Sequence, residues 1–272
     1  METLDTQGIA LPRLGLGTYL LKDAAGQAAV ESALALGYRH IDTAAMYDNE
    51  AAVGAGIAAA GLPRAELHVT TKVWYDQLAP EAMRRSLEAS LARLGLGYVD
   101  LFLIHWPAPD MDLPAAMAGL AALKEEGLTR AIGVSNFPLA LLRRAVEEIG
   151  APVACNQVEY HVYLGQKPLL DYQRGKGIPL VAYSPVAQGK LEADPVLRDL
   201  ADKHEATPSQ IGLAWLLDQK GVAAIPKAGR RESQQANLDA LRIRLDDEDR
   251  LIIGALPKTR RLIDPAFAPA WD

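Results

Sequence analysis

The chain has 272 residues, of which 50% are hydrophobic, and it carries a formal net charge of -6 with a sequence pI near 5.5. This length and apolar content suffice for a single well-buried α/β domain over residues 1–272. The acidic balance argues against nucleic acid or an anionic membrane as the main partner, and no apolar run approaches the roughly 20 residues that a membrane span needs. Without a signal-peptide pattern at the start, we expect a soluble cytoplasmic protein, and a monomer because no apolar element is left over.

Strand-like and helix-like segments alternate along the chain after a hairpin signal at Gln7-Gly8. Seven strands are predicted to start at Tyr38, Leu67, Val99, Arg130, Val153, Ile178 and Val222, with an eighth near Leu238 to Ile243. The intervening helices are predicted at 24–36, 50–60, 79–94, 113–126, 138–149, 168–176 and 209–218, and the acidic run 246–249 is predicted to open a final helix.

This alternation favours a (β/α)₈ TIM barrel, preceded by a β-hairpin and followed by a C-terminal loop. An open Rossmann sheet is the alternative. No G-x-G-x-x-G follows the first predicted strand, and Gly15-Leu16-Gly17-Thr18 comes before that strand rather than after it. The sequence therefore offers no dinucleotide fingerprint of the Rossmann kind.

Four residues with complementary chemistry lie at or just after the ends of three predicted strands: Asp42, Tyr47, Lys72 and His105. In a parallel sheet or barrel, the carboxyl ends of the strands converge on one mouth, where ligands bind. Reduction of a carbonyl by hydride needs a proton donor beside the oxygen and a group that stabilises the developing charge. Tyr47 can donate the proton, Lys72 can stabilise its phenolate, Asp42 can hold Lys72, and His105 can orient the carbonyl.

Each of these residues also has a structural interpretation, since Lys72 and Asp42 could form an ordinary ion pair while Tyr47 and His105 pack in the core. Their joint occurrence favours catalysis. Trp74 and Trp106 follow closely and are predicted to wall the pocket. The histidines lack ligand spacing such as H-E-x-x-H, so we expect no metal site. The single cysteine lies in an apolar run, where a buried structural thiol is expected.

Six motifs, in order along nearly the whole chain, resemble those of the aldo-keto reductases: Asp42-Thr43-Ala44-x-x-Tyr47, Thr71-Lys72-Val73-Trp74, Leu103-Ile104-His105-Trp106-Pro107, Gly133-Val134-Ser135-Asn136-Phe137, Asn156-Gln157-Val158-Glu159 and Ile225-Pro226-Lys227. Residues 47–54 and 268–272 resemble one bacterial subgroup. The resemblance implies a (β/α)₈ barrel that reduces aldehydes and ketones with NADPH, with NADH possible. The substrates implied are small carbonyls such as methylglyoxal and other 2-oxoaldehydes, or diketo sugar acids.

The resemblance also implies roles for individual residues. Tyr47 is the general acid, Lys72 and Asp42 tune it, and His105 orients the carbonyl. Ser135, Asn136 and Gln157 hold the nicotinamide carboxamide, and Tyr183 stacks on its ring. Ser184, Pro185, Ala187, Gln188 and Gly189 cover the pyrophosphate; Lys227 and Arg230 approach the 2′-phosphate, and Asn237 the adenine. The remaining expected cofactor contacts are Gly17, Thr18, Tyr19, Asp42 and Pro226, and the expected substrate contacts are Tyr19, Trp74 and Trp106.

The chain departs locally from the family pattern. Ala228 replaces a serine, while Ser233 and Ala236 replace an arginine and a glutamate, so a contact to the 2′-phosphate or adenine is lost. Tyr19 replaces a tryptophan of the pocket wall. Preference for NADPH over NADH is therefore expected to be modest. Two other functions stay open at this point: a cofactor-binding regulatory subunit with little turnover, and a lyase that forms a Schiff base on Lys72.

Overall fold

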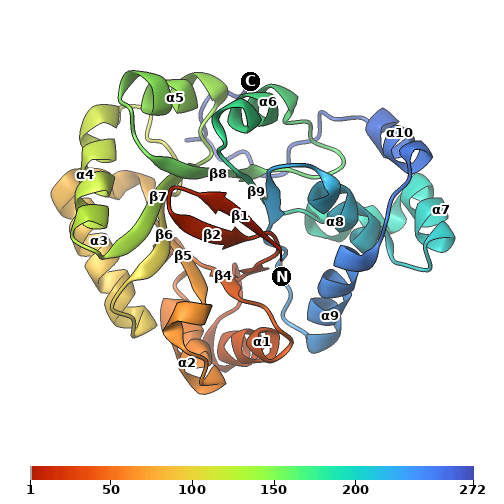
Figure 1. The fold of residues 1–272 in the computed structure, drawn as a ribbon, viewed down its shortest axis with the longest axis horizontal. Coiled ribbons are helices and arrows are strands. Elements are labelled where there is room, and N and C mark those ends of the chain that lie inside the picture. Colours follow the sequence, from red (N-terminus) through yellow and green to blue (C-terminus); the bar gives the residue numbers. More distant parts are fainter. Residues whose placement is uncertain (1) are drawn as a thin grey trace.

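The computed structural model describes residues 2–272. It contains a two-stranded hairpin and a sheet of eight parallel strands, with helices around the sheet (Figure 1). The strands are β1 (Thr3–Thr6), β2 (Ile9–Pro12), β3 (Leu16–Gly17), β4 (His40–Asp42), β5 (His68–Val73), β6 (Val99–Ile104), β7 (Thr129–Ser135), β8 (Val153–Glu159), β9 (Leu180–Tyr183) and β10 (Val222–Ala224). The α-helices are α1 (Asp23–Ala35), α2 (Glu50–Ala60), α3 (Pro80–Leu94), α4 (Leu113–Glu125), α5 (Leu139–Arg143), α6 (Lys167–Lys176), α7 (Pro195–Lys203), α8 (Pro208–Asp218), α9 (Arg231–Asp239) and α10 (Asp247–Ala255).

The strands of the large sheet lie side by side in the order of the sequence, from β3 to β10. A doubly wound Rossmann sheet reverses its strand order at a switch point, and no such reversal occurs among these strands. The sheet curls, so that its two edges approach. The backbone N–H of Gly15 donates to the carbonyl of Ala224 at 2.9 Å, and that of Gly17 donates to Pro226 at 3.1 Å.

The predicted eighth strand at Leu238 to Ile243 is wrong, because this segment forms the end of α9 and a 3₁₀ turn over Ala240–Arg242. Leu238 and Leu241 pack against the core at helical spacing. The strand that the prediction lacks is β3, which lies within Gly15-Leu16-Gly17-Thr18, the segment before the first predicted strand at Tyr38. A two-residue strand shows no alternation of apolar and polar side chains, so only its pairing with Ile41 and Asp42 of β4 defines it.

Most other elements confirm the pattern in the sequence. The hairpin turns at Gln7 and Gly8, both with positive φ, and α2 ends at Gly61 in the left-handed conformation. The acidic run opens α10, where Asp246 and Asp249 form a capping box. The helix predicted over 138–149 is instead α5 followed by a π-helical segment at Arg144–Glu148, and α7 was not predicted.

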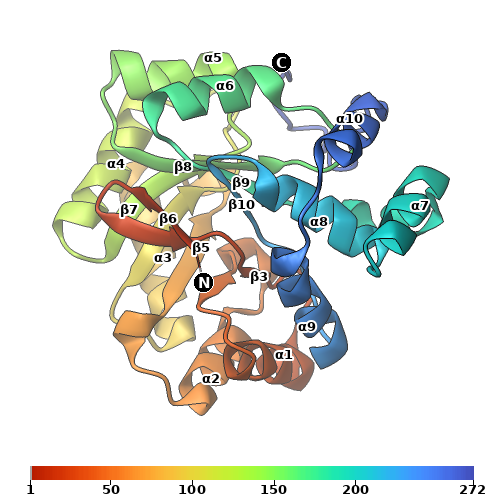
Figure 2. The same cartoon turned by 45° about the vertical axis from the view of Figure 1, so that its right-hand side comes forward.

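Two layers of core hold the sheet in place. The outer face of the sheet packs on the surrounding helices. Leu11 of the hairpin packs against side chains of the inner face, which include Leu101, Leu103, Cys155 and Val181. Cys155 is fully buried, and burial raises the pKa of its thiol, in agreement with a structural role. A third cluster joins α7, α8 and α10, which lie together at one side of the molecule (Figure 2). No helix within residues 2–272 is long and apolar enough to cross a membrane.

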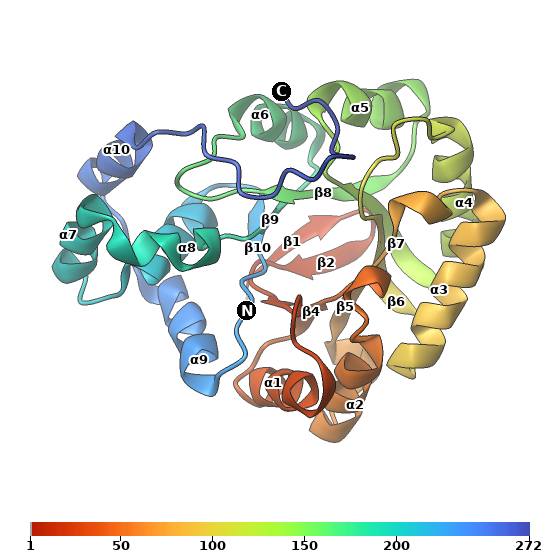
Figure 3. The ribbon, with the colours of Figure 1, turned by 180° about the vertical axis from the view of Figure 1, so that it is seen from behind.

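The hairpin and the C-terminal segment lie at opposite ends of the sheet. Figure 1 shows β1 and β2 across the end that carries the strand starts, whereas the view from behind shows the chain after α10 running across the other end (Figure 3). The predicted C-terminal loop is therefore confirmed, since no helix or strand follows Ala255 in the described chain. It lies on the side where the strands end, which is where the predicted functional residues lie.

Candidate active site

The structure brings Asp42, Lys72 and His105 together at the carboxyl ends of three adjacent strands. Asp42 ends β4, Lys72 lies near the end of β5, and His105 directly follows β6. The backbone N–H of His105 donates to the carbonyl of Val73 at 2.9 Å, which continues the pairing of β5 and β6 to this point. Tyr47 comes from the short 3₁₀ helix Ala45–Tyr47 that follows β4.

Lys72 and Asp42 form an ion pair in the interior. The ammonium donates to Asp42 Oδ1 at 2.5 Å and to the carbonyl of Thr43 at 2.8 Å, and the two side chains are 0% and 1% exposed. The second carboxylate oxygen accepts a hydrogen bond from Gln157 Nε2 at 2.8 Å. Because both oxygens have partners, the carboxylate is fixed in orientation and so is the ammonium that it holds.

Tyr47 and His105 lie next to this ion pair. The Lys72 ammonium is 5.3 Å from the centre of the Tyr47 ring, and the rings of Tyr47 and His105 meet edge to face at 5.5 Å. Burial raises the pKa of the Tyr47 phenol well above its ordinary value, and the nearby Asp42 carboxylate raises it further. At neutral pH the phenol is therefore protonated, as a general acid must be.

His105 is neutral at this site. Burial lowers the pKa of its imidazole well below the usual value, and the charge of Lys72 lowers it further. A neutral imidazole carries one N–H donor and one acceptor nitrogen. Its Nδ1 is buried without a hydrogen-bond partner, while its ring packs edge to face against Trp74 at 5.1 Å. The ring is thus held by packing, and its hydrogen-bonding capacity is not used up within the protein.

A chain of hydrogen bonds connects the next group of predicted residues. Ser135 Oγ donates to the carbonyl of Gln157 at 2.7 Å, Asn136 Nδ2 donates to the carbonyl of His105 at 2.9 Å, and Asn136 Oδ1 accepts from the Tyr183 hydroxyl at 2.8 Å. Asn136 has φ of 62°, the left-handed conformation that asparagine tolerates better than most residues. The strand ends of β7, β8 and β9 therefore place these four side chains beside the catalytic candidates.

The turn after β9 has an uncommon backbone. Ser184, Ala187, Gln188 and Gly189 all have positive φ, between 47° and 81°. Residues held in such conformations concentrate at ligand-binding segments. Across the mouth, Gly17 approaches the opposite edge of the sheet so closely that an added Cβ would lie 2.6 Å from the carbonyl oxygen of Ile225. Thr18, which follows, is fully buried and bonds the carbonyl of Asp42 through both its N–H and its hydroxyl.

The predicted phosphate-binding residues lie after β10. Lys227, Arg230 and Arg231 are exposed, and none of the three is part of an ion pair within residues 2–272. Arg230 precedes the first turn of α9, which has no side-chain cap. Unbonded N–H groups and the helix dipole favour an anion at such an end. Asn237 follows on α9, beside the Tyr38 hydroxyl.

Sequence reasoning missed part of the aromatic wall. Figure 3 shows the C-terminal segment over the mouth, and this segment brings in Phe267, which stacks on Tyr75 at 4.4 Å and meets Trp74 and Trp106 edge to face, each at 5.6 Å. Trp106 is itself only 4% exposed. The remaining wall residue, Tyr19, is 50% exposed and lies 5.1 Å from the Tyr47 ring. Nothing in the periodicity of the sequence could place Phe267 here.

Comparison with known proteins identifies the class. A family model described as the aldo/keto reductase family matches residues 13–256. The chain belongs to this family, and it is accordingly an oxidoreductase that works with NAD(P)H. The resemblance read from the sequence motifs is confirmed.

The relatives narrow the likeness further. The chain is 44% identical to methylglyoxal reductase DkgB of Escherichia coli O157:H7 over 268 residues, and this match covers 97% of this chain and 100% of that protein. It is 42% identical over 258 residues to the glyoxal reductase of Bacillus subtilis strain 168, covering 94% of this chain and 92% of that one. Among solved structures, one provisionally named a 2,5-diketo-D-gluconic acid reductase B superposes with a TM-score of 0.97 at 36% identity, covering 100% of this chain and 98% of the other.

Proposed function

We propose that this protein reduces small aldehydes and ketones to alcohols, with Tyr47 as the general acid. The observation that carries the proposal is the convergence of Tyr47 and His105 on the buried ion pair of Lys72 and Asp42. The names of the relatives point to 2-oxoaldehydes such as methylglyoxal, and to diketo sugar acids, as the substrate class.

A reduced nicotinamide bound beside Tyr183 would supply the hydride for the carbonyl carbon in the proposed reaction. Negative charge then develops on the carbonyl oxygen, and Tyr47 transfers its proton to that oxygen. The phenolate left behind is stabilised by the ammonium of Lys72, which Asp42 keeps charged and in place. His105, neutral because of its burial, donates a hydrogen bond to the oxygen and orients it.

We further propose how the cofactor is held. Ser135, Asn136 and Gln157 would bind the carboxamide, Tyr183 would pack on the nicotinamide ring, and the turn at 184–189 would cover the pyrophosphate. The remaining contacts would come from Gly17, Thr18, Tyr19, Asp42 and Pro226, with Asn237 at the adenine. The exposed cations Lys227, in the connection after β10, and Arg230, at the start of α9, fit a 2′-phosphate, which supports NADPH as the preferred cofactor. Since Ser233 and Ala236 offer no charged partner, the preference should be modest.

The proposal extends to the architecture. The isolated bridges Leu14–Ala224 and Gly17–Lys227 join the chain around β3 to the chain around β10, which supports a closed (β/α)₈ barrel formed by the whole chain as one domain. We also expect a monomer in the cytoplasm; sedimentation of the purified protein would test the monomer.

The decisive experiment measures NADPH oxidation with methylglyoxal by the wild-type protein and by Tyr47→Phe. The variant should bind NADPH normally but lose about 10²–10⁴-fold in kcat, the usual contribution of general acid catalysis. Tyr98→Phe, a change to a phenol at the opposite end of the sheet, serves as the control and should leave turnover unchanged. Turnover by Tyr47→Phe near the wild-type rate would refute the role of Tyr47. Binding of NADPH without turnover by the wild type would instead favour a regulatory subunit, and cofactor-free turnover would favour the lyase.

A further inference from the structure

The C-terminal segment 260–272, here called the strap, lies over the mouth of the sheet without helix or strand structure (Figure 3). It starts where the N–H of Arg260 donates to the carbonyl of Tyr163 at 2.9 Å. Near its end, the side chain of Asp272 accepts a hydrogen bond from the N–H of Leu139 at 2.8 Å. Within the strap, the N–H of Ala268 donates to the carbonyl of Pro265 and Trp271 Nε1 donates to Asp264 Oδ1, both at 2.8 Å. The rest of its backbone relies on contacts with the strands.

Those contacts centre on Glu159, the last residue of β8, which is fully buried. Its Oε1 accepts a hydrogen bond from the N–H of Leu262 at 2.7 Å, and its Oε2 accepts one from the N–H of Ile263 at 2.9 Å. Oε1 also lies 2.9 Å from Nε2 of His161, and this contact helps to fix the carboxylate. A carboxylate that bonds two successive backbone N–H groups makes charge-assisted hydrogen bonds, which are stronger than neutral ones.

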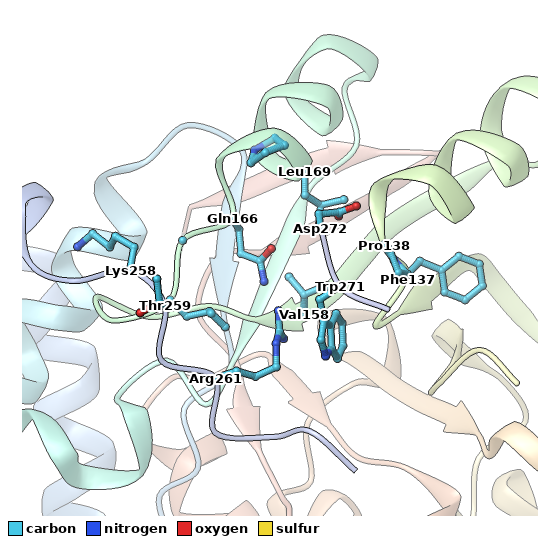
Figure 4. Close-up of a pocket in the computed structure, with 13 residues that line it drawn as sticks. Phe137, Pro138, Val158, Gln166, Leu169, Lys258, Thr259, Arg261, Trp271 and Asp272 are labelled. Carbon is cyan, nitrogen blue, oxygen red and sulfur yellow. The ribbon is translucent and has the colours of Figure 1, made fainter. Parts of the chain in front are cut away.

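Packing beneath this part of the strap is incomplete. A cavity of about 290 Å³ separates the strap from α6 and the end of β7, and its lining includes Arg261, Gln166, Phe137 and Trp271 (Figure 4). Side chains that line this pocket have no protein neighbour on that side. The position of the strap here depends correspondingly more on the hydrogen bonds to Glu159.

The strap connects this fastening point to the pocket wall. The Arg261 guanidinium, directly before the fastened residues, lies 3.6 Å from the centre of the Trp271 ring, and Figure 4 shows the two side chains next to each other. Trp271 meets Trp106 at 5.9 Å, and Phe267 stacks on Tyr75. A shift of the fastened segment would therefore move aromatic surface of the wall.

We propose that Glu159 is a positioning residue for substrate selectivity: by fastening Leu262 and Ile263, it holds Phe267 and Trp271 in the pocket wall. This inference rests on the proposed carbonyl reduction. Bulky aromatic aldehydes touch the wall and depend on its position, whereas methylglyoxal is too small to reach most of it. Glu159 acts through the strap and does not touch the reacting atoms.

The test compares Glu159→Gln and Phe267→Ala with the wild type, and Glu148→Gln, an exposed glutamate 70% accessible in its side chain, is the control. Amide hydrogen exchange of peptides covering 260–266 should accelerate in Glu159→Gln but not in Phe267→Ala or the control. Both wall-affecting variants should raise KM for benzaldehyde by about two- to tenfold, the range for losing one aromatic pair. The kcat of Glu159→Gln with methylglyoxal should stay near the wild-type value, because Glu159 lies outside the pocket wall.

Several outcomes would overturn the inference. Unchanged exchange at 260–266 in Glu159→Gln would remove the fastening role, and a loosened strap with unchanged benzaldehyde kinetics would remove the link to selectivity. If Glu159→Gln fails to fold, hydrogen exchange of the wild type and the kinetics of Phe267→Ala still test the inference. Unprotected amides at 262 and 263 in the wild type, or unchanged selectivity in Phe267→Ala, would each refute it. Absence of any wild-type turnover would instead refute the proposed function, while the exchange result would still report on the fastening of the strap.

Discussion

Replacement of Lys72 by methionine should cripple both activity and stability. The ammonium of Lys72 is the only cation within hydrogen-bonding distance of the Asp42 carboxylate among residues 2–272, and both side chains lie in the interior. Methionine fills a similar volume but donates no hydrogen bond. The variant leaves Asp42 with the single partner Gln157, and the carbonyl of Thr43 loses the donor it now has.

The size of the effect follows from this burial. Breaking a buried ion pair by removing one partner typically costs about 3–5 kcal/mol, because an uncompensated charge stays in the interior. In a domain of this size each kcal/mol shifts the melting temperature by about 2–4 °C, so Lys72→Met should melt about 6–20 °C below the wild type. Turnover should fall as well, because the phenolate of Tyr47 loses its stabilising cation.

The assay is a thermal melt beside steady-state kinetics with methylglyoxal. The matched control is Lys167→Met, since Lys167 and Asp171 are also 2.5 Å apart but are 84% and 52% exposed. Exposed pairs contribute about 0–1 kcal/mol, so the control should hardly change the melt. Equal melting shifts in both variants would refute the reasoning from burial, and unchanged turnover in Lys72→Met would remove Lys72 from the catalytic group.

Three further predictions concern the cofactor, the pocket wall and pH. Lys227→Ala should raise KM for NADPH about tenfold or more and leave KM for NADH nearly unchanged, since one charge-assisted hydrogen bond is worth about 1.5–3 kcal/mol. Steady-state kinetics at low and high salt check this, with Lys220→Ala as the control. Better use of NADH than of NADPH by the wild type would contradict the prediction. Trp106→Ala should raise KM for aromatic aldehydes about tenfold, because its aromatic contacts are lost, and should leave NADPH binding intact. An equal loss of kcat/KM for all aldehydes, together with a lower melting temperature, would indicate a packing role instead. Burial lowers the pKa of His40 to about 4 and that of His68 well below its usual value. The unfolded chain binds these protons below about pH 6.5 and the folded chain does not, so the free energy of unfolding should fall by roughly 3 kcal/mol for His40 as the pH drops from about 6.5 to about 4. Urea titrations across this range check the sign, and His40→Asn should flatten the slope; a rise in stability toward pH 4 would contradict the argument.

The amino-acid sequence determined those parts of the protein that have a local signature. Helices and the longer strands are visible in the spacing of apolar residues, and glycine or aspartate at their ends sets where they stop or start. Asp42, Lys72 and His105 were predicted to converge because each lies at or just after the end of a strand, and parallel strands end at one mouth. Their proximity in the structure follows from that rule, while their roles in catalysis stay predictions.

Only the tertiary structure decided the features that depend on distant partners. β3 has two residues and exists because it pairs with β4, so no periodicity could reveal it, whereas the apolar residues near Leu238 were read as a strand although they pack as a helix end. The strap has no periodic pattern either. Phe267 reaches the wall, and Glu159 bonds Leu262 more than a hundred residues further along the chain, through contacts that form only when the folded sheet brings them together. Short-range preferences of the backbone are written in neighbouring residues, but a hydrogen bond or a ring contact across such a separation depends on the geometry of the whole fold.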